Sequence, residues 1–368
     1  MRIYEVGGAV RDELLGLTVK DRDYVVVGAT PEEMTDLGYR PVGKDFPVFL
    51  HPETHDEHAL ARTERKTARG YHGFEFHADP DVTLEQDLAR RDLTINAIAK
   101  DEDGALIDPH NGVEDLEAGV LRHVSAAFAE DPVRILRVAR FAARFGFDIA
   151  PETFELMRSM VTSGEVDALV PERVWQELAR GLMEDRPSRM FEVLQECGAL
   201  SKVAPEIAAL FDEPERAQAA LHALDAASDA GDSLEVRFAA LARALDPYAV
   251  ETLANRLKLP SPVRELSVLA ARHGNSIVDA EELAPEAILD LLNASDAWRR
   301  PERLEELFRA SVAGERGTER ALERLKLARE AAAAVDAGAI AKASPKAIKE
   351  RVNAARLEAI AKALANAS

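Results

Sequence analysis

The stretch that decides the fold is GGAVRDELLGLTVKDRDYVVV, which runs from Gly7 to Val27. It opens with two glycines, continues with a helix-like run, and places Asp21 and Asp23 in front of the run Tyr24–Val27. Such a run, rich in β-branched residues and closed by glycine, predicts a strand. Because residues i and i+2 of a strand point to the same face, we expect the two carboxylates to lie side by side.

Two carboxylates this close repel each other unless a cation neutralises them. Mg²⁺ is usually held by one or two carboxylates together with substrate phosphates, and metal ions held in this way support phosphoryl transfer. Asp21 and Asp23 are therefore the predicted Mg²⁺ ligands. Taken alone, the pair also fits a solvated turn at the edge of a strand.

Gly7 and Gly8 separate a predicted strand from the predicted helix AVRDELLG. Glycine lets the backbone approach a phosphate, and the free N–H groups of a helix N-terminus favour anions. Arg11 lies one turn further along this helix, so we expect it to reach the same phosphate. Together with Asp21 and Asp23, these residues favour a nucleotide site over an ordinary tight turn.

This arrangement resembles the first motif of the nucleotidyltransferases of the DNA polymerase β superfamily. In particular it is similar to that of the class II bacterial tRNA nucleotidyltransferases, the CCA-adding enzymes. The resemblance implies transfer of CMP and AMP from CTP and ATP to the 3′ end of tRNA. It also implies that Asp21 and Asp23 are catalytic metal ligands, that one of them helps to deprotonate the 3′ hydroxyl, and that Gly8 and Arg11 hold the triphosphate.

The stretch DLARRDLTINAIA, residues 87–99, resembles the second motif of that family. The spacing of its apolar residues and of those just before it predicts a helix. The resemblance implies that Arg91 binds the ribose and the triphosphate. Seen alone, Arg90, Arg91 and Asp92 fit a salt-bridge network on a helix surface equally well.

The stretch EDPVRILRVARF, residues 130–141, resembles the family's E-D-x-x-R helix. Arginines every three residues (Arg134, Arg137 and Arg140) form one basic stripe on a helix, and Asp131 is expected on the same side as Arg134. A carboxylate and a guanidinium can together read a base edge that carries an amine and a ring acceptor, as cytosine and adenine do. We therefore expect Asp131 and Arg134 to select CTP and ATP and to reject UTP, with Arg137 and Arg140 as further nucleotide contacts. A charged helix face with an internal ion pair is the alternative.

The segment ARTERKTARGYHGFEF, residues 61–76, mixes arginine and lysine with two glycines and reads as a mobile basic loop. In the family, a loop in this region helps the enzyme to change from C to A addition. Its full length argues against an enzyme that adds only CC. An ordinary solvated loop is the alternative.

Residues 1–125 mix strand and helix patterns, whereas helical periodicity continues from there almost to the C-terminus. The predicted fold class is α+β: a polymerase-β-like head with a mixed sheet, followed by an all-helical neck, body and tail. The predicted divisions are a head over 1–125, neck, template and body helices over 126–210, a helical region over 211–300, and a tRNA-binding tail over 301–368.

Some family members carry a His-Asp phosphohydrolase domain, whose metal site needs an adjacent His-Asp pair and further histidines. In this chain His222 and His273 stand without such a pair, and scattered histidines do not make a metal site. We expect neither phosphodiesterase nor phosphatase activity, and a shortened helical remnant over 211–300. The last helical segment is locally basic and is expected to contact the phosphates of the tRNA acceptor and T arms.

The 368 residues include 46 Lys and Arg against 66 Asp and Glu, a formal charge of −20. This balance argues against a general nucleic-acid binder and makes a local basic surface necessary for RNA binding. One cysteine, Cys197, excludes a disulfide framework, and no stretch approaches the roughly 18 apolar residues of a membrane span. We expect a cytoplasmic enzyme without an obligatory protein partner. The alternatives are an A-adding or CC-adding specialist, a poly(A) polymerase, or an inactive tRNA-binding protein.

Overall fold

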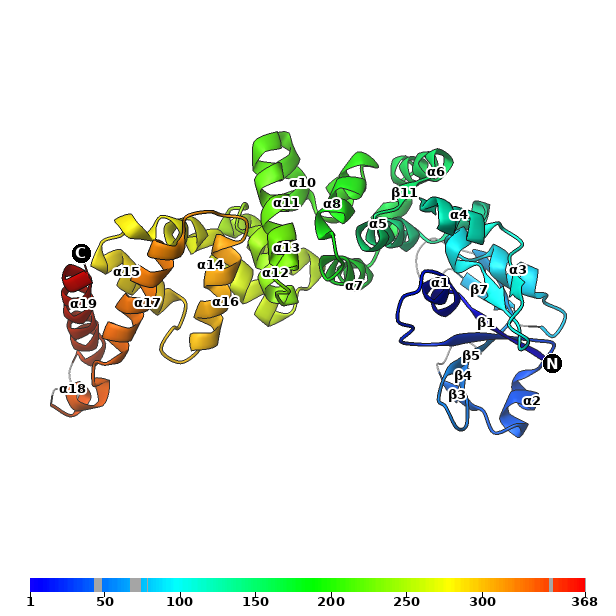
Figure 1. Cartoon of the computed structure of the whole chain (residues 1–368), viewed down its shortest axis with the longest axis horizontal. Coiled ribbons are helices and arrows are strands. Elements are labelled where there is room, and N and C mark those ends of the chain that lie inside the picture. Colours follow the sequence, from blue (N-terminus) through cyan, green and yellow to red (C-terminus); the bar gives the residue numbers. More distant parts are fainter. Residues whose placement is uncertain (43–47, 67–73, 78, 344–346, 368) are drawn as a thin grey trace. The chain divides into compact units, whose positions relative to one another are not determined.

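The computed structural model describes residues 1–42, 48–66, 74–77, 79–343 and 347–367. Its chain forms two compact units. Unit 1 contains Met1–Gly181 and Arg189–Val203, and unit 2 contains Leu182–Ser188 and Ala204–Ser368. The predicted fold class is confirmed, since a mixed sheet with helices precedes a long all-helical part (Figure 1).

Unit 1 is built on a seven-stranded sheet with the order β3-β4-β5-β2-β1-β8-β9. Its central strands β1 and β2 are antiparallel, and β2 pairs in parallel with β5. The strands span Arg2–Val6 (β1), Asp23–Val27 (β2), Arg40–Val42 (β3), Val48–Leu50 (β4), Glu57–Leu60 (β5), Ala99–Lys100 (β8) and Leu106–Ile107 (β9). Successive side chains along β1 and β2 point to opposite faces of the sheet, so each face carries its own set of buried apolar side chains.

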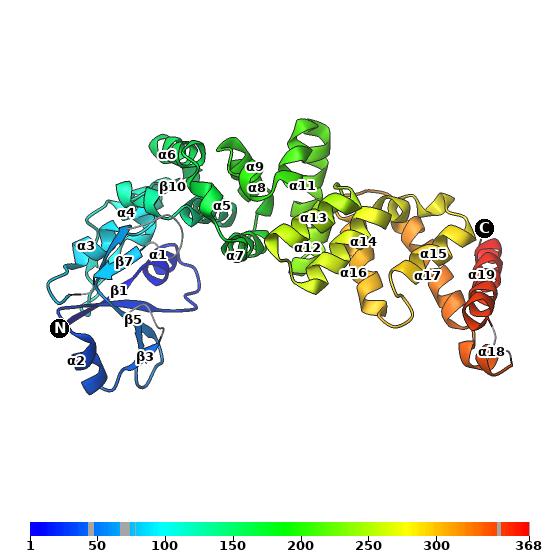
Figure 2. The same ribbon diagram turned by 180° about the vertical axis from the view of Figure 1, so that it is seen from behind.

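Helices cover both faces of this sheet (Figures 1 and 2). On one face, α2 (Pro31–Asp36) packs its Met34 against Val26 and Leu60. On the other face, α3 (Leu84–Ala89) packs against Val25 and the neighbouring strands. Helix α1 (Gly8–Leu14) connects β1 to β2. The sequence predictions of strands at the start of the chain and of the helix at α1 are confirmed.

The helix expected through residues 87–99 is wrong for most of its length. Helix α3 begins at a capping box formed by Thr83 and Gln86 and ends at Ala89. Arg91 and Asp92 lie beyond that end, and a short 3-10 turn (η1, Thr94–Asn96) and strand β8 follow. The Asp92 carboxylate accepts the Leu93 N–H at 2.9 Å. In a continuing helix, this N–H would instead donate to a backbone carbonyl one turn earlier.

A set of helices completes unit 1. They are α4 (Gly112–Ala118), α5 (Val133–Phe145), α6 (Pro151–Thr162), α7 (Pro171–Leu182), α8 (Pro187–Glu196) and α9 (Leu200–Val203), with 3-10 turns η2 (Ala126–Glu130) and η3 (Glu165–Ala168). A short parallel ladder of β10 (Val120–Leu121) with β11 (Asp148–Ile149) brackets α5. Asp131 lies before α5 in extended conformation rather than on the helix, because Pro132 separates it from the first helical residue.

The predicted basic loop is in part a β-hairpin. Strands β6 (Thr63–Lys66) and β7 (Phe74–His77) pair antiparallel as a separate two-stranded sheet. The tip of the predicted loop, residues 67–73, lies outside the described residues. Its proposed part in changing from C to A addition stays a prediction.

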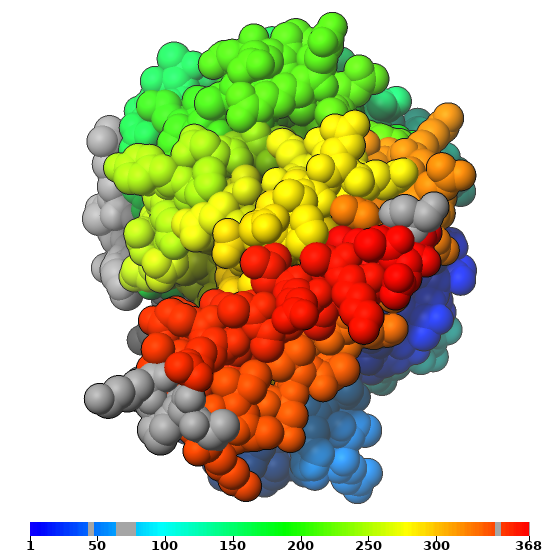
Figure 3. All heavy atoms as spheres, turned by 90° about the vertical axis from the view of Figure 1, so that its left-hand side faces the viewer, coloured from blue at the N-terminus to red at the C-terminus, as the bar shows by residue number. Residues whose placement is uncertain are grey.

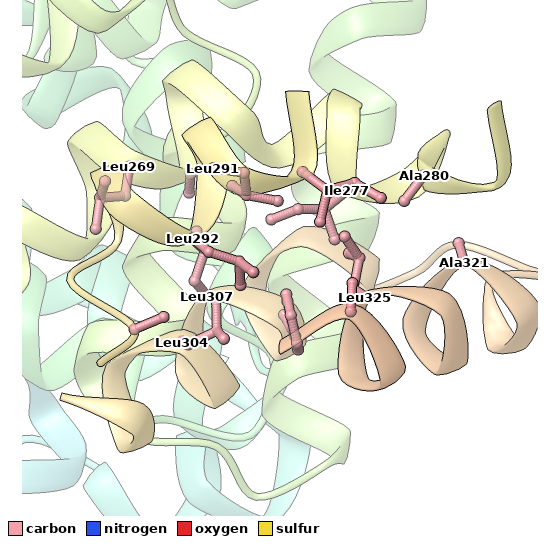
Figure 4. Packing of buried hydrophobic residues seen from close by; sticks show 14 of the residues in the cluster. Leu269, Ile277, Ala280, Leu291, Leu292, Leu304, Leu307, Ala321 and Leu325 are labelled. Atoms are coloured by element: carbon pink, nitrogen blue, oxygen red, sulfur yellow. The ribbon is translucent and has the colours of Figure 1, made fainter. Parts of the chain in front are cut away.

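Unit 2 consists of helices throughout its described residues. They are α10 (Pro205–Ala208), α11 (Pro214–Asp229), α12 (Leu234–Ala242), α13 (Pro247–Leu257), α14 (Ser261–Val278), α15 (Pro285–Ala294), α16 (Pro301–Val312), α17 (Glu319–Ala333), α18 (Ala337–Ala343) and α19 (Ile348–Ala367), with 3-10 turns η4 (Ala209–Asp212) and η5 (Ala280–Glu282). Leucine and isoleucine side chains from α14 to α17 meet in one core, which includes Ile277, Leu292, Leu307 and Leu325 (Figure 4).

Helix α19 closes unit 2 on one side and packs against α15 and α17 (Figure 3). Its Ile360 and Leu364 are buried in the unit 2 core, and Arg356 lies over the ring of Trp298 at 3.9 Å from the centroid. Trp298 is thus a packing residue. Lys349 and Lys362 of the basic tail are exposed. In the described part of the chain, every helix is too short or too polar to cross a bilayer.

Candidate active site

The glycine pair forms the turn between β1 and α1. Gly7 has φ +72° and ψ −129°, a conformation that favours glycine, and its carbonyl accepts the N–H of Arg11 at 3.1 Å to begin the helix. The antiparallel register pairs Val6 with Asp23, so the first residue of β2 lies beside the start of this turn. The sheet therefore brings the predicted phosphate loop and one predicted metal ligand together.

Asp21 and Asp23 both remain exposed, and only Asp23 belongs to strand β2. Partial desolvation by the surrounding protein raises the pKa of Asp23, the Arg91 guanidinium lowers it, and the Asp21 and Asp56 carboxylates raise it. The two aspartates are thus close enough to repel each other. Within the described residues no group of three or more histidine, cysteine or acidic side chains could hold a metal ion, so the pair would need substrate oxygens to complete a coordination shell.

Arg22, between the two aspartates, points to the opposite face of the sheet. There it forms an ion pair with Glu5, which is buried on β1 and also accepts from Lys100 Nζ at 3.0 Å. Because adjacent residues of an extended chain point in opposite directions, this pairing directs the neighbouring Asp23 carboxylate to the other face.

Arg91 lies directly against the glycine turn. Its Nη2 donates to Asp87 at 3.2 Å, and its Nη1 donates to the carbonyl of Asn96 at 3.4 Å. A Cβ atom at Gly7 would be 2.9 Å from this Nη1. Among the described residues, none is a hydrogen-bond partner of the buried Nε of Arg91. The predicted partners Gly7, Asp23 and Arg91 therefore meet at one place, which supports their assignment to a triphosphate site.

Arg11, in contrast, is buried and already bonded. Its Nε and Nη2 donate to Asp12 Oδ1 at 2.8 and 2.7 Å, and Nη1 donates to Asn96. Its guanidinium also lies over the rings of Phe141 and Phe145, at 5.1 and 5.0 Å from the centroids. Burial lowers the pKa of Arg11. In this arrangement Arg11 connects α1 to α5, and its predicted contact with phosphate would require these bonds to open.

The arginine stripe of α5 does not present one basic face. Arg134 donates to the carbonyls of Ala127 and Arg90 at 3.0 and 2.6 Å. Arg137 donates from Nε to Asp92 at 2.7 Å, and Arg140 donates from Nε to Glu177 at 2.8 Å. Burial alone would raise the pKa of Asp92, but the Arg137 guanidinium holds it well below the usual range. The stripe exists in the helix, but each arginine is fixed by a different element.

Asp131 is the remaining member of the predicted base-selecting pair. Both its oxygens accept from Arg173 of α7, at 3.2 and 2.8 Å, and Oδ1 also accepts the N–H of Val133 at 3.1 Å. The Arg134 backbone N–H donates to the Asp131 carbonyl at 3.0 Å, so the two residues are neighbours. The prediction of an aspartate and an arginine on one side of a single helix is wrong, because Asp131 precedes the helix and its carboxylate binds α7.

Comparison with known proteins identifies the family. Residues 3–122 match the model of the poly A polymerase head domain, and residues 146–211 match that of the probable RNA and SrmB-binding site of polymerase A. The multifunctional CCA protein of Chromobacterium violaceum is 56% identical over 399 residues, with 98% of each chain covered. That of Nitrosomonas europaea is 52% identical over the full length of both chains. The chain belongs to the CCA protein family. It is a nucleotidyltransferase of the class II type that the sequence resemblance implies.

Solved structures agree with this CCA protein fold. A tRNA-processing enzyme complex is 26% identical, with 98% of this chain and 97% of that chain covered and a TM-score of 0.65. The Thermotoga maritima CCA-adding enzyme complexed with tRNA has a TM-score of 0.69 at 23% identity, over 100% of this chain and 92% of that chain, and is evidence for the fold alone. The polymerase-β-like head is thereby confirmed.

This member of the CCA protein family lacks residues that its relatives have. The alignment with the Chromobacterium violaceum protein extends over 399 positions, more than the 368 residues of the chain. The missing positions are therefore internal gaps. This shortening is consistent with the absence of an intact His-Asp domain that the sequence predicts.

Several structural partners of the site are not apparent from the CCA-family motifs. They are Asp12, Asp87, Asn96, Arg173 and Glu177. Asp87 and Asn96 lie inside the second motif, four residues before and five residues after Arg91. This short spacing is the sequence feature that could have indicated their contacts with Arg91. Arg173 and Glu177 lie in an amphipathic helix more than 30 positions from their partners on the Asp131–Arg140 segment, and nothing local in the sequence connects them.

Proposed function

We propose that this chain adds CCA to the 3′ end of tRNA, using CTP and ATP as substrates and Mg²⁺ as the metal ion. The names and full-length similarity of the CCA protein relatives support the reaction. The single observation that carries the site assignment is the meeting of Asp23, the Gly7–Gly8 turn and Arg91 at one end of β1 and β2. The reaction implies a cytoplasmic location, where tRNA and both nucleotides are available.

Asp21 and Asp23 are the proposed Mg²⁺ ligands. Desolvation is the main cause of the raised pKa of Asp23, and repulsion by the Asp21 carboxylate adds to it; a divalent cation would relieve that repulsion. Two carboxylates with the oxygens of a substrate triphosphate match the usual Mg²⁺ site. When bound, the metal ions neutralise charge on the transferring phosphoryl group and its leaving oxygen. One of the two aspartates would also accept the proton of the tRNA 3′ hydroxyl.

Gly8 and Arg91 would hold the nucleotide on the phosphate side. Helix α1 begins at Gly8, where the first backbone N–H groups of a helix have no intrahelical partner, and the Arg91 guanidinium lies beside the preceding Gly7. A planar guanidinium binds phosphate oxygens in pairs, which adds direction to the attraction. Arg11 would act mainly by fixing α1 against α5, and through that helix by fixing the turn.

Asp131 and Arg134 would select the base. The carboxylate would accept from the exocyclic amine of cytosine or adenine, and the guanidinium would donate to the ring acceptor beside it. Uracil carries a carbonyl in place of the amine. Two hydrogen-bond acceptors, this carbonyl and the carboxylate, would then face each other. Arg137 and Arg140 would support this pair by fixing α5 to Asp92 and Glu177.

The test uses purified protein with Mg²⁺ and tRNA transcripts that end before CCA or after CC. Each transcript receives CTP, ATP, UTP or CTP with ATP, and products are separated at single-nucleotide resolution. The expected result is CCA added to the first transcript and A to the second, with no further growth and no use of UTP. Addition of A to the CC end alone identifies an A-adding specialist, and untemplated A tails identify a poly(A) polymerase.

A catalytically silent tRNA-binding protein is the alternative from another class. The Asp21→Asn variant distinguishes it, because tRNA binding by filter retention should remain while addition stops. The salt dependence of that retention reports phosphate contacts, and binding should weaken steeply as salt rises. Lys349 and Lys362 of α19 are proposed to supply such contacts to the acceptor and T arms.

A further inference from the structure

The Asp131 carboxylate is oriented from outside its own segment. Arg173 of α7 donates Nη1 to Oδ1 at 3.2 Å and Nη2 to Oδ2 at 2.8 Å, so the fork of the guanidinium faces both oxygens. Two parallel bonds fix the plane of a carboxylate, whereas one bond leaves it free to rotate. The Val133 N–H adds a third donor on Oδ1.

Arg134 is held by a separate set of partners. Its guanidinium donates to the backbone carbonyls of Ala127 and Arg90, and the residue is buried. Asp131 and Arg173 keep 21% and 26% of their side chains exposed, so the carboxylate stays within reach of a ligand. The two members of the proposed base-selecting pair are therefore oriented independently, one by α7 and the other by carbonyls.

Helix α7 is itself fixed to α5 one turn beyond Arg173. Glu177 accepts from Arg140 Nε at 2.8 Å, and both side chains are nearly fully buried. Residues four apart lie on one face of a helix, so Arg173 and Glu177 approach α5 together. The buried ion pair thus fixes the part of α7 from which the Arg173 side chain extends.

We propose that Arg173 is a positioning residue for nucleotide selection, which sets the plane of the Asp131 carboxylate against the base. The inference rests on the proposed function. A carboxylate offers about four acceptor sites, so its bonds to Arg173 and Val133 leave a lone pair for an exocyclic amine. A fixed carboxylate meets a uracil carbonyl with unrelieved repulsion, whereas a carboxylate that can rotate away tolerates it. Loss of the fork should therefore reduce the choice of base more than the transfer itself.

The test compares Arg173→Lys with Arg180→Lys, which changes an exposed arginine of the same helix. Lysine keeps the charge but cannot bond both oxygens in a plane. We measure single-turnover kcat and KM for CTP, ATP and UTP on tRNA lacking CCA. The Arg173→Lys variant should lower the ratio of kcat/KM for CTP over UTP by about 10-fold or more, and Arg180→Lys should leave it unchanged.

A double variant separates positioning from stability. If Arg173 acts through Asp131, then Arg173→Lys should change nothing further in a chain that already carries Asp131→Asn. Thermal unfolding of each variant identifies any loss of folded protein. Equal losses of rate for all three nucleotides, with the selectivity ratio kept, would overturn the inference and leave the proposed function standing. A wild-type protein that adds no nucleotide to any transcript would instead overturn the proposed function, and this inference with it.

Discussion

The guanidinium of Arg91 occupies the space that a side chain at Gly7 would need, with Nη1 2.9 Å from the position of a Cβ atom there. Gly7 also has a positive φ of 72°. The glycine is thus required twice, once by its backbone and once by its neighbour. Arg91 approaches the turn only because residue 7 has no side chain.

Replacement of Gly7 by alanine should therefore affect nucleotide binding as well as stability. Gly16→Ala is the matched control, because Gly16 has a similar φ of +70° and nothing within 4 Å of its Cβ position. Both variants should lose roughly 1–3 kcal/mol of unfolding free energy from backbone strain. Only Gly7→Ala should also raise KM for CTP, in steady-state assays at saturating tRNA. A similar KM for the two variants would show that Arg91 adjusts without consequence.

Asp23→Asn should abolish activity and yet stabilise the metal-free protein. The folded state raises the pKa of Asp23, so it binds a proton more readily than the unfolded chain does. This contribution to stability favours the folded state at low pH and is lost as pH rises through the raised pKa. At neutral pH the ionised Asp23 carboxylate therefore destabilises the folded state. Asparagine removes that charge. Thermal unfolding at pH 7 without metal should show an equal or higher Tm for the variant.

Mg²⁺ should reverse that order of stability. The wild-type Tm should rise with Mg²⁺ and nucleotide, because a ligand that binds only the folded state stabilises it. The Tm of the Asp23→Asn variant should not rise under the same conditions. Nucleotide addition should fall about 100-fold or more, since the metal supplies several kcal/mol of charge stabilisation. An Asp36→Asn variant, which alters an exposed aspartate of α2, controls for the loss of charge alone.

Metal affinity should weaken as the medium becomes acidic. A proton competes with the cation for Asp23, and the raised pKa moves this competition above the ordinary range of aspartate, near 3.9. Asp21→Asn removes one cause of the raised pKa, so the carboxyl of Asp23 in that variant should titrate at lower pH. Carbon NMR of the side-chain carboxyl measures both titrations. An unchanged Asp23 titration would contradict the closeness of the two groups.

Glu177→Gln should destabilise unit 1 strongly, because it removes the Glu177 charge from its ion pair with the buried Arg140. Breaking one side of a buried ion pair costs about 3–5 kcal/mol. Glu155→Gln is the control, since the Glu155–Arg158 pair is exposed on α6 and such pairs contribute about 0–1 kcal/mol. Urea unfolding followed by circular dichroism gives both values. Similar costs for the two variants would mean that solvent reaches Arg140 in the folded state.

Glu5→Gln should disturb the spacing of the two metal ligands without touching them. The substitution weakens the ion pair that fixes Arg22, the residue between Asp21 and Asp23. We expect the Mg²⁺ requirement for activity to rise about 10-fold, at the lower end of the 10–100-fold range of substitutions around metal ligands. Glu13→Gln is the control, because Glu13 is exposed and forms its ion pair with Lys100 rather than with Arg22. Equal Mg²⁺ requirements in both variants would exclude a positioning role for Glu5.

The sequence patterns were sufficient for strands β1 and β2 and for the turn between β1 and α1, because these depend on neighbours two to four residues apart. They were not sufficient for the end of α3, where Asp92 accepts a backbone N–H in competition with the helix. They also could not identify the partners of α5. Arg173 follows Asp131 by 42 positions, and Asp92 precedes Arg137 by 45, so only the tertiary fold pairs these charges.

The bonds around Arg11 have a consequence for how unit 1 opens. A continuous chain runs from Arg137 through Asp92 and Asn96 to Arg11, and from there through Asp12 back to Arg144 of the same helix. Neither α1 nor α5 can detach without breaking bonds of the other. Their backbone amides should therefore exchange with deuterium in a single cooperative step, and the phosphate turn at Gly7 should be as long-lived as the helix behind it.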